Sequence, residues 1–442
     1  MKTDKSHRGM THKNTEDNKL EDANFRIMLF DLSIYGHHPG YIQYLLEYVK
    51  RHQLTQRLLI VVSPRFITAH ADVVAFAETL ETDNITFIPI SVDEEKGLKP
   101  RSSGINRNFR NFQEWAIFRR YAKQHRADHA LVMYYDTYQY PLALRFNPTC
   151  SVSGIYFRPS FHYGQFSHGE SIGLSYRRQK WEKFLLDRVL ANRRLKNLFS
   201  LDPFIVERLE KEHSHGAKLC HLPDPVKLQK SSQSEIAQLR QSLEIAPNKK
   251  IFLLFGALTE RKGVFKVLDA LALLPQQVSK QVTLILAGEA SEENQRLIDK
   301  KVQFLPKAKQ IQVIVRYEFL PEKKIPTYFG LADFVLAPYQ RHIGMSGMTM
   351  LAAAAHTPLL SSNYGLMGEL VQRFKLGITV DSTLPTSIAE GVEQLINNPA
   401  DIDVARMDQF SQMNAAEKFS ATIFNRIMPT HRKRMPAEQR DR

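Results

Sequence analysis

Short apolar runs alternate with segments of helical spacing along the first half of the chain. The apolar runs that predict strands lie at residues 25–32, 57–63, 85–90, 130–135, 154–157 and 197–201. Residues 41–50 (YIQYLLEYVK) have the spacing of a helix, which follows a predicted loop at 33–40, and a second helix is expected within 176–191. Alternating strands and helices of these lengths predict a parallel sheet with crossover helices.

The alternation stops at residues 222–248, where a turn-rich stretch precedes a polar helix, and then starts again. Further strands are predicted at 251–255, 282–287, 311–315, 334–337, 358–361 and 377–380. The helices between them are expected at 262–274, 292–304, 322–331, 347–355 and 366–374, with a last one from Pro385. The predicted fold class is therefore α/β, with two Rossmann-like, doubly wound parallel-sheet domains.

These patterns set the expected domain limits. We expect a disordered segment at 1–24, an N-terminal domain at 25–222, a C-terminal domain at 223–415, and a helix with a basic tail at 416–442. Open parallel sheets bind ligands at the carboxyl ends of their strands. The two domains are therefore expected to face each other across a cleft that holds the site.

Composition narrows the class of protein. The 442 residues are 43% hydrophobic, which excludes a disordered or collagen-like chain, and they carry a formal net charge of +14. Such a charge favours nucleic acid, an anionic membrane surface or a phosphate-bearing ligand, but no nucleic-acid recognition motif is present. No apolar run is long enough to span a membrane and the first residues are too polar for a signal peptide, which favours a cytoplasmic protein. The distant Cys150 and Cys220 predict neither a disulfide framework nor a zinc site.

The most informative motif is FGALTERKG, at residues 255–263, between a predicted strand and a predicted helix. Gly256 permits a tight turn at the strand end, and Arg261 and Lys262 stand where a helix N-terminus already favours an anion. This arrangement predicts a phosphate site formed by backbone N–H groups and a cation. The alternative is an ordinary surface loop with solvated charges.

Two later loops have the same context. In the first, at 337–358, Ser346 is a natural N-cap next to Gly347, and His342 lies just upstream. In the second, at 362–371, Gly365 and Glu369 follow a strand end. We expect all three loops to contribute to one anion-binding or hydroxyl-binding edge. Capping by Ser346 and a favourable helix-dipole position for Glu369 explain these residues equally well without a ligand.

The three loops, in this order, resemble the C-terminal domain of the family 4 retaining glycosyltransferases, also called glycosyl transferases group 1, which have the GT-B fold. The resemblance extends from about residue 222 to about residue 380. It implies that Lys262 holds the diphosphate of a nucleotide sugar and that the turn from Gly365 to Glu369 lies beside the donor sugar.

This sequence departs from the family pattern at three positions. The family has two glutamates eight positions apart, and here Ile343 and Leu351 occupy the corresponding positions. An arginine expected just after Gly256 is Ala257. Replacement polar contacts are expected from His342 and Ser346, and replacement charge from Arg261.

In the N-terminal half, the catalytic candidates are His37, His38 and Asp136, and Arg158 is a candidate for the acceptor side. His37 and His38 lie in the run GHHPG at 36–40, where such enzymes have a glycine-bearing loop facing the donor diphosphate. Asp136 follows ALVMYY, and a carboxylate there would orient or deprotonate an acceptor hydroxyl. Arg158 ends GIYFRP and is an acceptor-side candidate. Structural roles for the histidines and a solvated loop position for Asp136 are the alternatives.

The resemblance implies transfer of a sugar, expected to be a hexose, from a nucleotide diphosphate sugar to an acceptor hydroxyl, with retention and without metal or cofactor. The expected acceptor is a glycan or a lipid-linked molecule of polysaccharide or glycolipid biosynthesis. Because the glutamate pair is missing, a homologue without catalysis that binds a sugar, a nucleotide or a partner is the main alternative. A GT-B-like epimerase or phosphorylase is another.

Most of the positive charge lies outside the three loops. Residues 175–196 place arginines and lysines at helical spacing among Trp181, Phe184 and leucines, and His431–Arg434 forms a second basic cluster. A basic amphipathic helix of this kind predicts peripheral attachment to an anionic membrane, here on its inner face. The alternative is a helix whose apolar face packs on the core and whose basic face is solvated.

Overall fold

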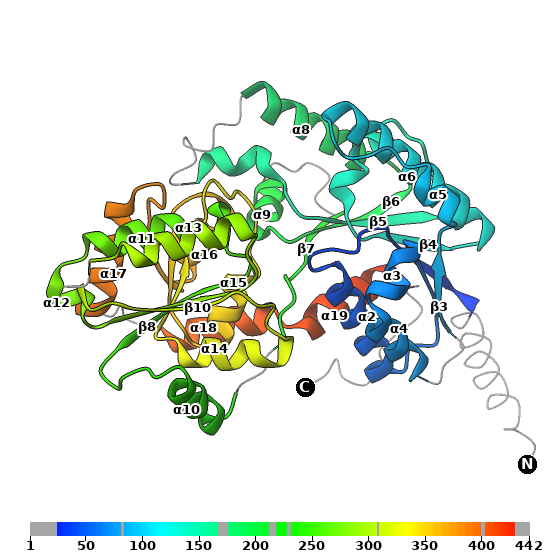
Figure 1. The fold of residues 1–442 in the computed structure, drawn as a ribbon. Helices are drawn as coiled ribbons and strands as arrows, with labels where there is room; N and C mark the ends of the chain where they lie inside the picture. Colours follow the sequence, from blue (N-terminus) through cyan, green and yellow to red (C-terminus); the bar gives the residue numbers. More distant parts are fainter. Residues whose placement is uncertain are drawn as a thin grey trace, which may run out of the picture. The chain divides into compact units, whose positions relative to one another are not determined.

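A computed structural model describes residues 24–80, 84–166, 176–211, 218–227, 231–306, 309–398 and 403–428. The chain divides into two compact units (Figure 1). The N-terminal unit comprises residues 1–159, 180–222 and 417–442, and the C-terminal unit comprises 160–179 and 223–416. The predicted disordered segment, except for Asn24, and the basic cluster at 431–434 lie outside the described residues.

The N-terminal unit is built on seven parallel strands in the order β3-β2-β1-β4-β5-β6-β7. Their bounds are β1 Arg26–Asp31, β2 Arg57–Val62, β3 Ile85–Pro89, β4 His129–Val132, β5 Ser151–Tyr156, β6 Leu195–Ser200 and β7 Leu219–His221. The central strands are almost entirely buried, because helices cover both faces of a parallel sheet. The short strand β7 was not anticipated from the sequence.

The helical elements of the first half are α2 His38–His52, α3 Pro64–Ala69, α4 Ala71–Glu78, α5 Val92–Lys96, α6 Gly104–Gln124, η1 Tyr135–Thr137, α7 Gln139–Ala143, η2 Ser160–Gln165, α8 Tyr176–Leu190 and α9 Pro203–Lys211. The predicted loop at 33–40 is wrong at its end, since α2 begins at His38 and not at Tyr41. Pro39 fits the first turn because proline lacks the N–H that this turn leaves unbonded. His37 is therefore the N-cap position of α2, and His38 is its first residue.

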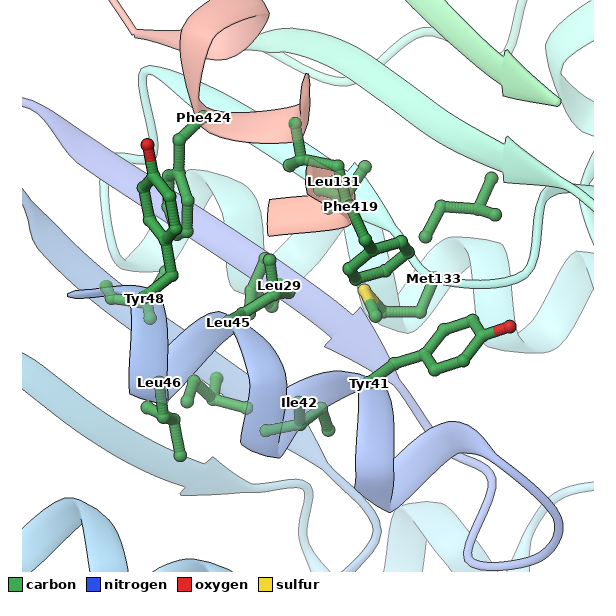
Figure 2. Packing of buried hydrophobic residues seen from close by; sticks show 14 of the residues in the cluster. Leu29, Tyr41, Ile42, Leu45, Leu46, Tyr48, Leu131, Met133, Phe419 and Phe424 are labelled. Carbon is green, nitrogen blue, oxygen red and sulfur yellow. The ribbon is translucent and has the colours of Figure 1, made fainter. Parts of the chain in front are cut away.

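The last helix, α19 (Ala416–Ile427), packs into the core of the N-terminal unit. Figure 2 shows Phe419 and Phe424 of α19 against α2 and the central strands, with Tyr41 and Tyr48 as neighbouring rings. Polar contacts reinforce this packing, since Arg51 and His52 at the end of α2 both bind Glu417. The N-terminal unit is thus formed from segments at both ends of the described chain.

The C-terminal unit is built on six parallel strands in the order β10-β9-β8-β11-β12-β13. The strands are β8 Lys250–Phe255, β9 Val282–Ala287, β10 Gln312–Arg316, β11 Phe334–Ala337, β12 Leu359–Ser362 and β13 Gly377–Val380. The helical elements are α10 Gln233–Ser242, η4 Glu260–Lys262, α11 Val264–Leu273, α12 Gln276–Ser279, α13 Glu292–Gln303, η6 Glu322–Lys324, α14 Ile325–Leu331, α15 Gly347–Ala354, α16 Gly365–Arg373, α17 Pro385–Asn397 and α18 Val404–Met413.

The predicted fold class is confirmed, with two parallel-sheet, Rossmann-like units. All six strands predicted in the C-terminal half are present within one residue of their expected ends. The helix predicted at 262–274 begins two residues later, because a 3₁₀ turn and a left-handed glycine, Gly263, precede α11. Lys262 therefore lies in the connecting loop and not in the helix.

Candidate functional site

Each sheet has one point at which its strand order reverses. In the N-terminal unit this point lies between β1 and β4, and in the C-terminal unit it lies between β8 and β11. The loops leaving adjacent strands in opposite directions diverge there, which opens a crevice at the carboxyl edge of an open sheet. The predicted site residues follow β1, β4 and β5 in one unit, and β8, β11 and β12 in the other.

In the C-terminal unit, two glycines fix the path of the loop after β8. Gly263 has a φ of +80°, and a Cβ built on it would lie 2.3 Å from the carbonyl oxygen of Pro338, in the loop after β11. The same two loops are joined by a hydrogen bond of 2.8 Å from the Gln340 N–H to the Arg261 carbonyl. Gly256 has a φ of +92°, and a Cβ there would lie 3.2 Å from Lys262 Nζ. The glycines thus hold Lys262 between two touching loops.

Lys262 is the centre of this edge. Its ammonium group donates to the hydroxyl of Tyr339 and lies 4.4 Å from the centre of the tyrosine ring. Burial, with the neighbouring charge of Arg261 second, lowers the pKa of Lys262 to about 7. The amine is thus close to half protonated at neutral pH, and an anion bound beside it would favour its charged form.

Tyr339 links Lys262 to the second predicted loop. The Ser346 hydroxyl donates to the Tyr339 oxygen at 2.9 Å, and the Arg261 guanidinium lies 5.5 Å from the tyrosine ring centre. Burial raises the pKa of Tyr339 to about 12, so the phenol stays neutral. Ser346 also caps α15, because its oxygen accepts the N–H of Met348 at 3.3 Å. The structure therefore brings Arg261, Lys262 and Ser346 together around a tyrosine.

The third predicted loop packs on the second. Gly365 has a φ of +67°, and a Cβ there would lie 2.9 Å from the carbonyl oxygens of His342 and Ile343. The His342 ring lies 5.2 Å from the Tyr339 ring, and its Nε2 bonds the Met345 carbonyl at 2.9 Å. His342 therefore braces its own loop, and its role as a donor contact stays a prediction.

Glu369 and Gly347 are less closely tied to the cluster. Glu369 pairs with Arg373 one turn further along α16, at 3.0 Å. Gly347 opens α15, and a Cβ there would meet nothing within 4 Å. At the same edge, the hydroxyls of Thr259, Thr349 and Ser362 are buried and have no hydrogen-bond partner among the described residues. These hydroxyls could form hydrogen bonds to a polar ligand if the loops rearranged on binding.

In the N-terminal unit, the central feature is a carboxylate–histidine pair at the end of β1. Asp31 is buried, and its Oδ2 lies 2.6 Å from Nδ1 of His38, while its Oδ1 accepts the N–H of Ser33 at 2.9 Å. Because a carboxylate only accepts, Nδ1 of His38 carries the hydrogen. The neutral ring then presents Nε2 as a base.

Aromatic rings surround this pair. The His37 ring stacks on Tyr41 and Phe157, with centroids 5.2 and 5.4 Å apart, and the His38 ring lies 5.5 Å from that of Tyr134. The protein atoms around His37, followed by the charge of His38, lower the pKa of His37 although the residue as a whole is exposed. His37 therefore stays neutral at physiological pH and contributes a stacking surface.

Asp136 holds the loop after β5. Its two carboxylate oxygens accept the backbone N–H groups of Phe157 and Arg158, at 2.9 and 3.1 Å. Burial raises the pKa of Asp136 to about 6, although these hydrogen bonds and the charge of Arg158 act in the opposite direction. Arg158 in turn donates to the Tyr134 hydroxyl at 2.5 Å. The four residues predicted in this half, His37, His38, Asp136 and Arg158, thus share one edge.

The sequence did not single out Asp31, Tyr134 or Tyr339. Asp31 is the polar last residue of the apolar run RIMLFD, and Tyr339 comes two positions after a strand end. Both positions carry a signal, since side chains at the carboxyl end of a parallel strand face the usual ligand site. Tyr134 gave no such signal, because it resembles its apolar neighbours in ALVMYY.

The described residues contain no group of three or more histidine, cysteine, aspartate or glutamate side chains placed to hold a metal ion. Among them there is also no helix with the length and apolar character needed to cross a membrane. At the two positions where the resemblance predicts a glutamate pair, the carbonyl of Ile343 accepts the N–H of Leu366, and Leu351 lies within α15.

Comparisons with known proteins agree with this architecture. Residues 235–413 match the family model described as Glycosyl transferases group 1. A putative glycosyltransferase, YtcC, of Bacillus subtilis is 25% identical over 199 residues, which are 43% of this chain and 48% of that protein. A glycogen synthase of Mycobacterium tuberculosis is 30% identical over 154 residues, 34% of either chain. The chain thus spans about half the length of the first curated relative and a third of the second.

Solved structures match over nearly the whole chain. Anabaena Alr3699/HepE in complex with UDP and glucose has a TM-score of 0.58 at 17% identity, covering 91% of this chain and 99% of that one. Sucrose-phosphate synthase from Thermosynechococcus elongatus has a TM-score of 0.63 at 14% identity, covering 91% and 98%. At these identities the likeness establishes the fold. The chain therefore has the GT-B fold, and residues 235–413 of its C-terminal unit are similar to the glycosyl transferases group 1 family.

Proposed function

We propose that the protein transfers a sugar from a nucleoside-diphosphate sugar to an acceptor hydroxyl. The observation that carries the proposal is the cluster of Lys262, Tyr339 and Ser346 at the switch point of the C-terminal sheet. A half-buried lysine with its pKa lowered to about 7 lies between two loops that glycines hold together. A diphosphate is the kind of ligand that such a site recognises, because its negative charge stabilises an ammonium group that has lost its hydration.

In this proposal, the bond between the sugar C1 and the diphosphate oxygen breaks, and its electron pair leaves with the diphosphate. Lys262 and Arg261 stabilise the developing negative charge, together with the N–H groups at the start of α15. With these cations in place, the reaction proceeds without added metal or cofactor. The acceptor oxygen forms the new bond to C1, and the resemblance to family 4 enzymes favours retention of the anomeric configuration.

The proton of the acceptor hydroxyl must leave as the new bond forms. We assign this step to His38, whose Nε2 accepts the proton while Asp31 holds the ring and stabilises its charged form. His37 and Asp136, the other catalytic candidates, act here by supplying a stacking ring and by holding the Arg158 loop. Arg158 is the proposed contact for an anionic part of the acceptor.

A glycan or lipid-linked acceptor, used in polysaccharide or glycolipid synthesis, is compatible with a stacking surface next to a base. The sugar moved is proposed to be a hexose. Because a structural neighbour was solved with UDP and glucose, UDP-glucose is the first donor to test.

One observation favours a second candidate function. Ile343 and Leu351 offer no side-chain hydrogen bond where the resemblance places two carboxylates. A homologue that binds a nucleotide sugar but has lost transfer would keep the Lys262 cluster and lack such groups. The Asp31–His38 pair has no evident use in a protein of this kind.

The test is an assay of nucleoside diphosphate released from a panel of nucleotide sugars, with EDTA present and with crude lipid and oligosaccharide acceptors. We expect release with one donor, acceptor-dependent in wild type and lost in Lys262→Met. Tight nucleotide binding without release from any donor would favour the second function. Absence of both binding and release would overturn the proposal.

A further inference from the structure

Large apolar side chains are exposed together on one part of the N-terminal unit, apart from the carboxyl edge of its sheet. They lie in the first half of α6, in the loop after α7 and on α8. Their exposed fractions run from 47% to 84%, and the residues are Ile105, Phe109, Leu144, Phe146, Trp181 and Phe184. We call this set the aromatic surface.

A chain of contacts joins the three elements. The Phe146 ring lies 6.0 Å from that of Phe112 on α6, and the Phe146 carbonyl accepts the Trp115 indole N–H at 2.6 Å. On the other side, Trp181 of α8 donates to the Tyr140 hydroxyl of α7 at 3.4 Å. The loop after α7 thus connects α6 to α8, and the six residues lie on these three connected elements.

Helix periodicity explains why these side chains point outward. On α8 the buried face is aliphatic and consists of Leu185, Leu186, Val189 and Leu190. Trp181 and Phe184 stack on each other on the exposed side, with ring centres 5.5 Å apart. The helix at 176–190 therefore has an aliphatic face packed on the core and a separate aromatic face in solvent.

The charges around the aromatic surface are mostly positive. Segment 101–124 contains six basic residues and one acidic residue, Glu114, which is buried between Arg101 and Arg110. Arg107 of α6 and Arg145, which directly precedes Phe146, are exposed. On α8 the Arg188 guanidinium lies 5.8 Å from the Phe184 ring centre. Exposed aromatic rings among basic side chains have the composition of surfaces that lie in the headgroup region of a membrane.

We propose that the aromatic surface docks on an anionic lipid membrane, with its rings among the headgroups and its arginines against the lipid phosphates. An anionic bilayer is the occupant that the charge favours, because it meets apolar and basic groups at the same time. This inference does not depend on sugar transfer, since none of its residues belongs to the proposed site.

The experiment is co-sedimentation of the full chain with vesicles of phosphatidylcholine, with and without about a third of phosphatidylglycerol, at low salt. We expect binding to the anionic vesicles only, and at least a tenfold loss of affinity in Phe109→Ser/Trp181→Ser and in Arg107→Glu/Arg145→Glu. The matched controls change the same kinds of residue in the C-terminal unit. Phe304→Ser/Phe319→Ser removes two exposed aromatic side chains. Lys280→Glu/Lys300→Glu changes two exposed basic residues and gives the same net charge as the arginine variant. These controls should bind as wild type does.

Trp181 supplies a second, direct readout. Of the two tryptophans, Trp181 is 50% exposed and Trp115 only 2% exposed, so insertion of the surface should shift Trp181 emission to the blue. No binding by wild type, or equal losses in surface and control variants, would overturn the proposal. Loss of vesicle binding only when the basic residues at 431–434 are neutralised would also overturn the proposal. Conversion of a dimer to a monomer by the aromatic variant, with vesicle binding intact, would instead identify a self-association interface and also overturn it.

Discussion

The two units share one topology but have different chemistry at the corresponding point. At the switch point of the N-terminal sheet, a buried carboxylate holds a histidine among aromatic rings. At that of the C-terminal sheet, glycine-restricted loops hold a desolvated lysine against a tyrosine. The sheet determines where a ligand binds, and the loops determine which groups meet it.

The difference also concerns how much change each edge tolerates. In the C-terminal unit, a Cβ built on Gly263 or on Gly365 would lie within 3 Å of the backbone of a neighbouring loop. Gly36, in the loop after β1, and Gly40, in the first turn of α2, have nothing within 4 Å of that position. At Gly263 and Gly365 the C-terminal edge is thus closely packed and specific for one backbone path, whereas Gly40 of the N-terminal unit has room for a side chain.

The largest expected effect separates catalysis from donor binding. His38→Ala removes the proposed base and should lower kcat by about a thousandfold, the range of general-base catalysis. The affinity for UDP, measured by calorimetry, should stay unchanged, because the nucleotide meets the other unit. Asp31→Asn should give a smaller loss and shift the pH profile of kcat. A kcat unaffected by His38→Ala would mean that His38 is not the base of the reaction.

The packing difference is tested by a pair of glycine substitutions. Gly263→Ala places a Cβ against the Pro338 carbonyl at a positive φ and should lower the free energy of unfolding by about 3 kcal/mol. Gly40→Ala, in α2 of the other unit, meets no neighbouring atom and should be stabilising by about 0.5 kcal/mol. Urea titration measures both, and similar values for the two would refute the contrast.

Removing the lysine charge should weaken nucleotide binding next most. Lys262→Met keeps most of the side-chain volume and should raise the Kd for UDP about 30-fold, or ~2 kcal/mol, the worth of a charge-assisted hydrogen bond. The control is Lys266→Met on α11, which should leave the Kd within a factor of two, an effect of about 0.4 kcal/mol at most. Equal effects of the two variants would mean that Lys262 does not meet the diphosphate.

The lowered pKa of Lys262 predicts a pH dependence of known sign. Bound diphosphate favours the ammonium form, so above the free-state pKa of about 7 binding must take up a proton. UDP affinity should therefore fall about tenfold from pH 7 to 8.5, where the phosphates are already ionised. Lys262→Arg stays charged and should show a flat profile. An affinity of wild type that is constant over this interval would contradict the assignment.

The smallest effect is expected at Tyr339. Tyr339→Phe keeps the ring beneath Arg261 and Lys262 but removes the oxygen that Lys262 and Ser346 share. We expect about a fivefold rise in the Kd for UDP, ~1 kcal/mol, the net worth of one hydrogen bond. Tyr317→Phe, after the outermost strand β10, should leave the affinity unaltered. A loss as large as that of Lys262→Met would give the phenol a direct contact with the ligand.

Sequence patterns were sufficient for every strand except the three-residue β7, because buried parallel strands are continuous apolar runs such as VTLILA in β9. They were less useful for the amphipathic helices of the N-terminal unit. Helix α6 was not anticipated, because it is rich in polar residues and has only a narrow apolar stripe. The three loops after β8, β11 and β12 were found because glycines and charged residues follow the apolar runs of these strands.

The partners of the site residues could not be found in the same way. That His38 binds Asp31, and that Lys262 binds Tyr339 across 77 positions, depends on which strands lie side by side. Local spacing contains no information about strand order. The burial that lowers the pKa of Lys262 has the same origin, since it comes from loops distant in the chain.

The packing of α19 has a consequence for synthesis. Residues 417–427 complete a core that begins with β1 and α2, although the whole C-terminal unit is made in between. Until α19 emerges from the ribosome, the side chains it will cover, including Leu29 and Tyr41, remain open to water or to a chaperone. The core whose first strand is translated first is therefore closed only after the C-terminal unit has been made.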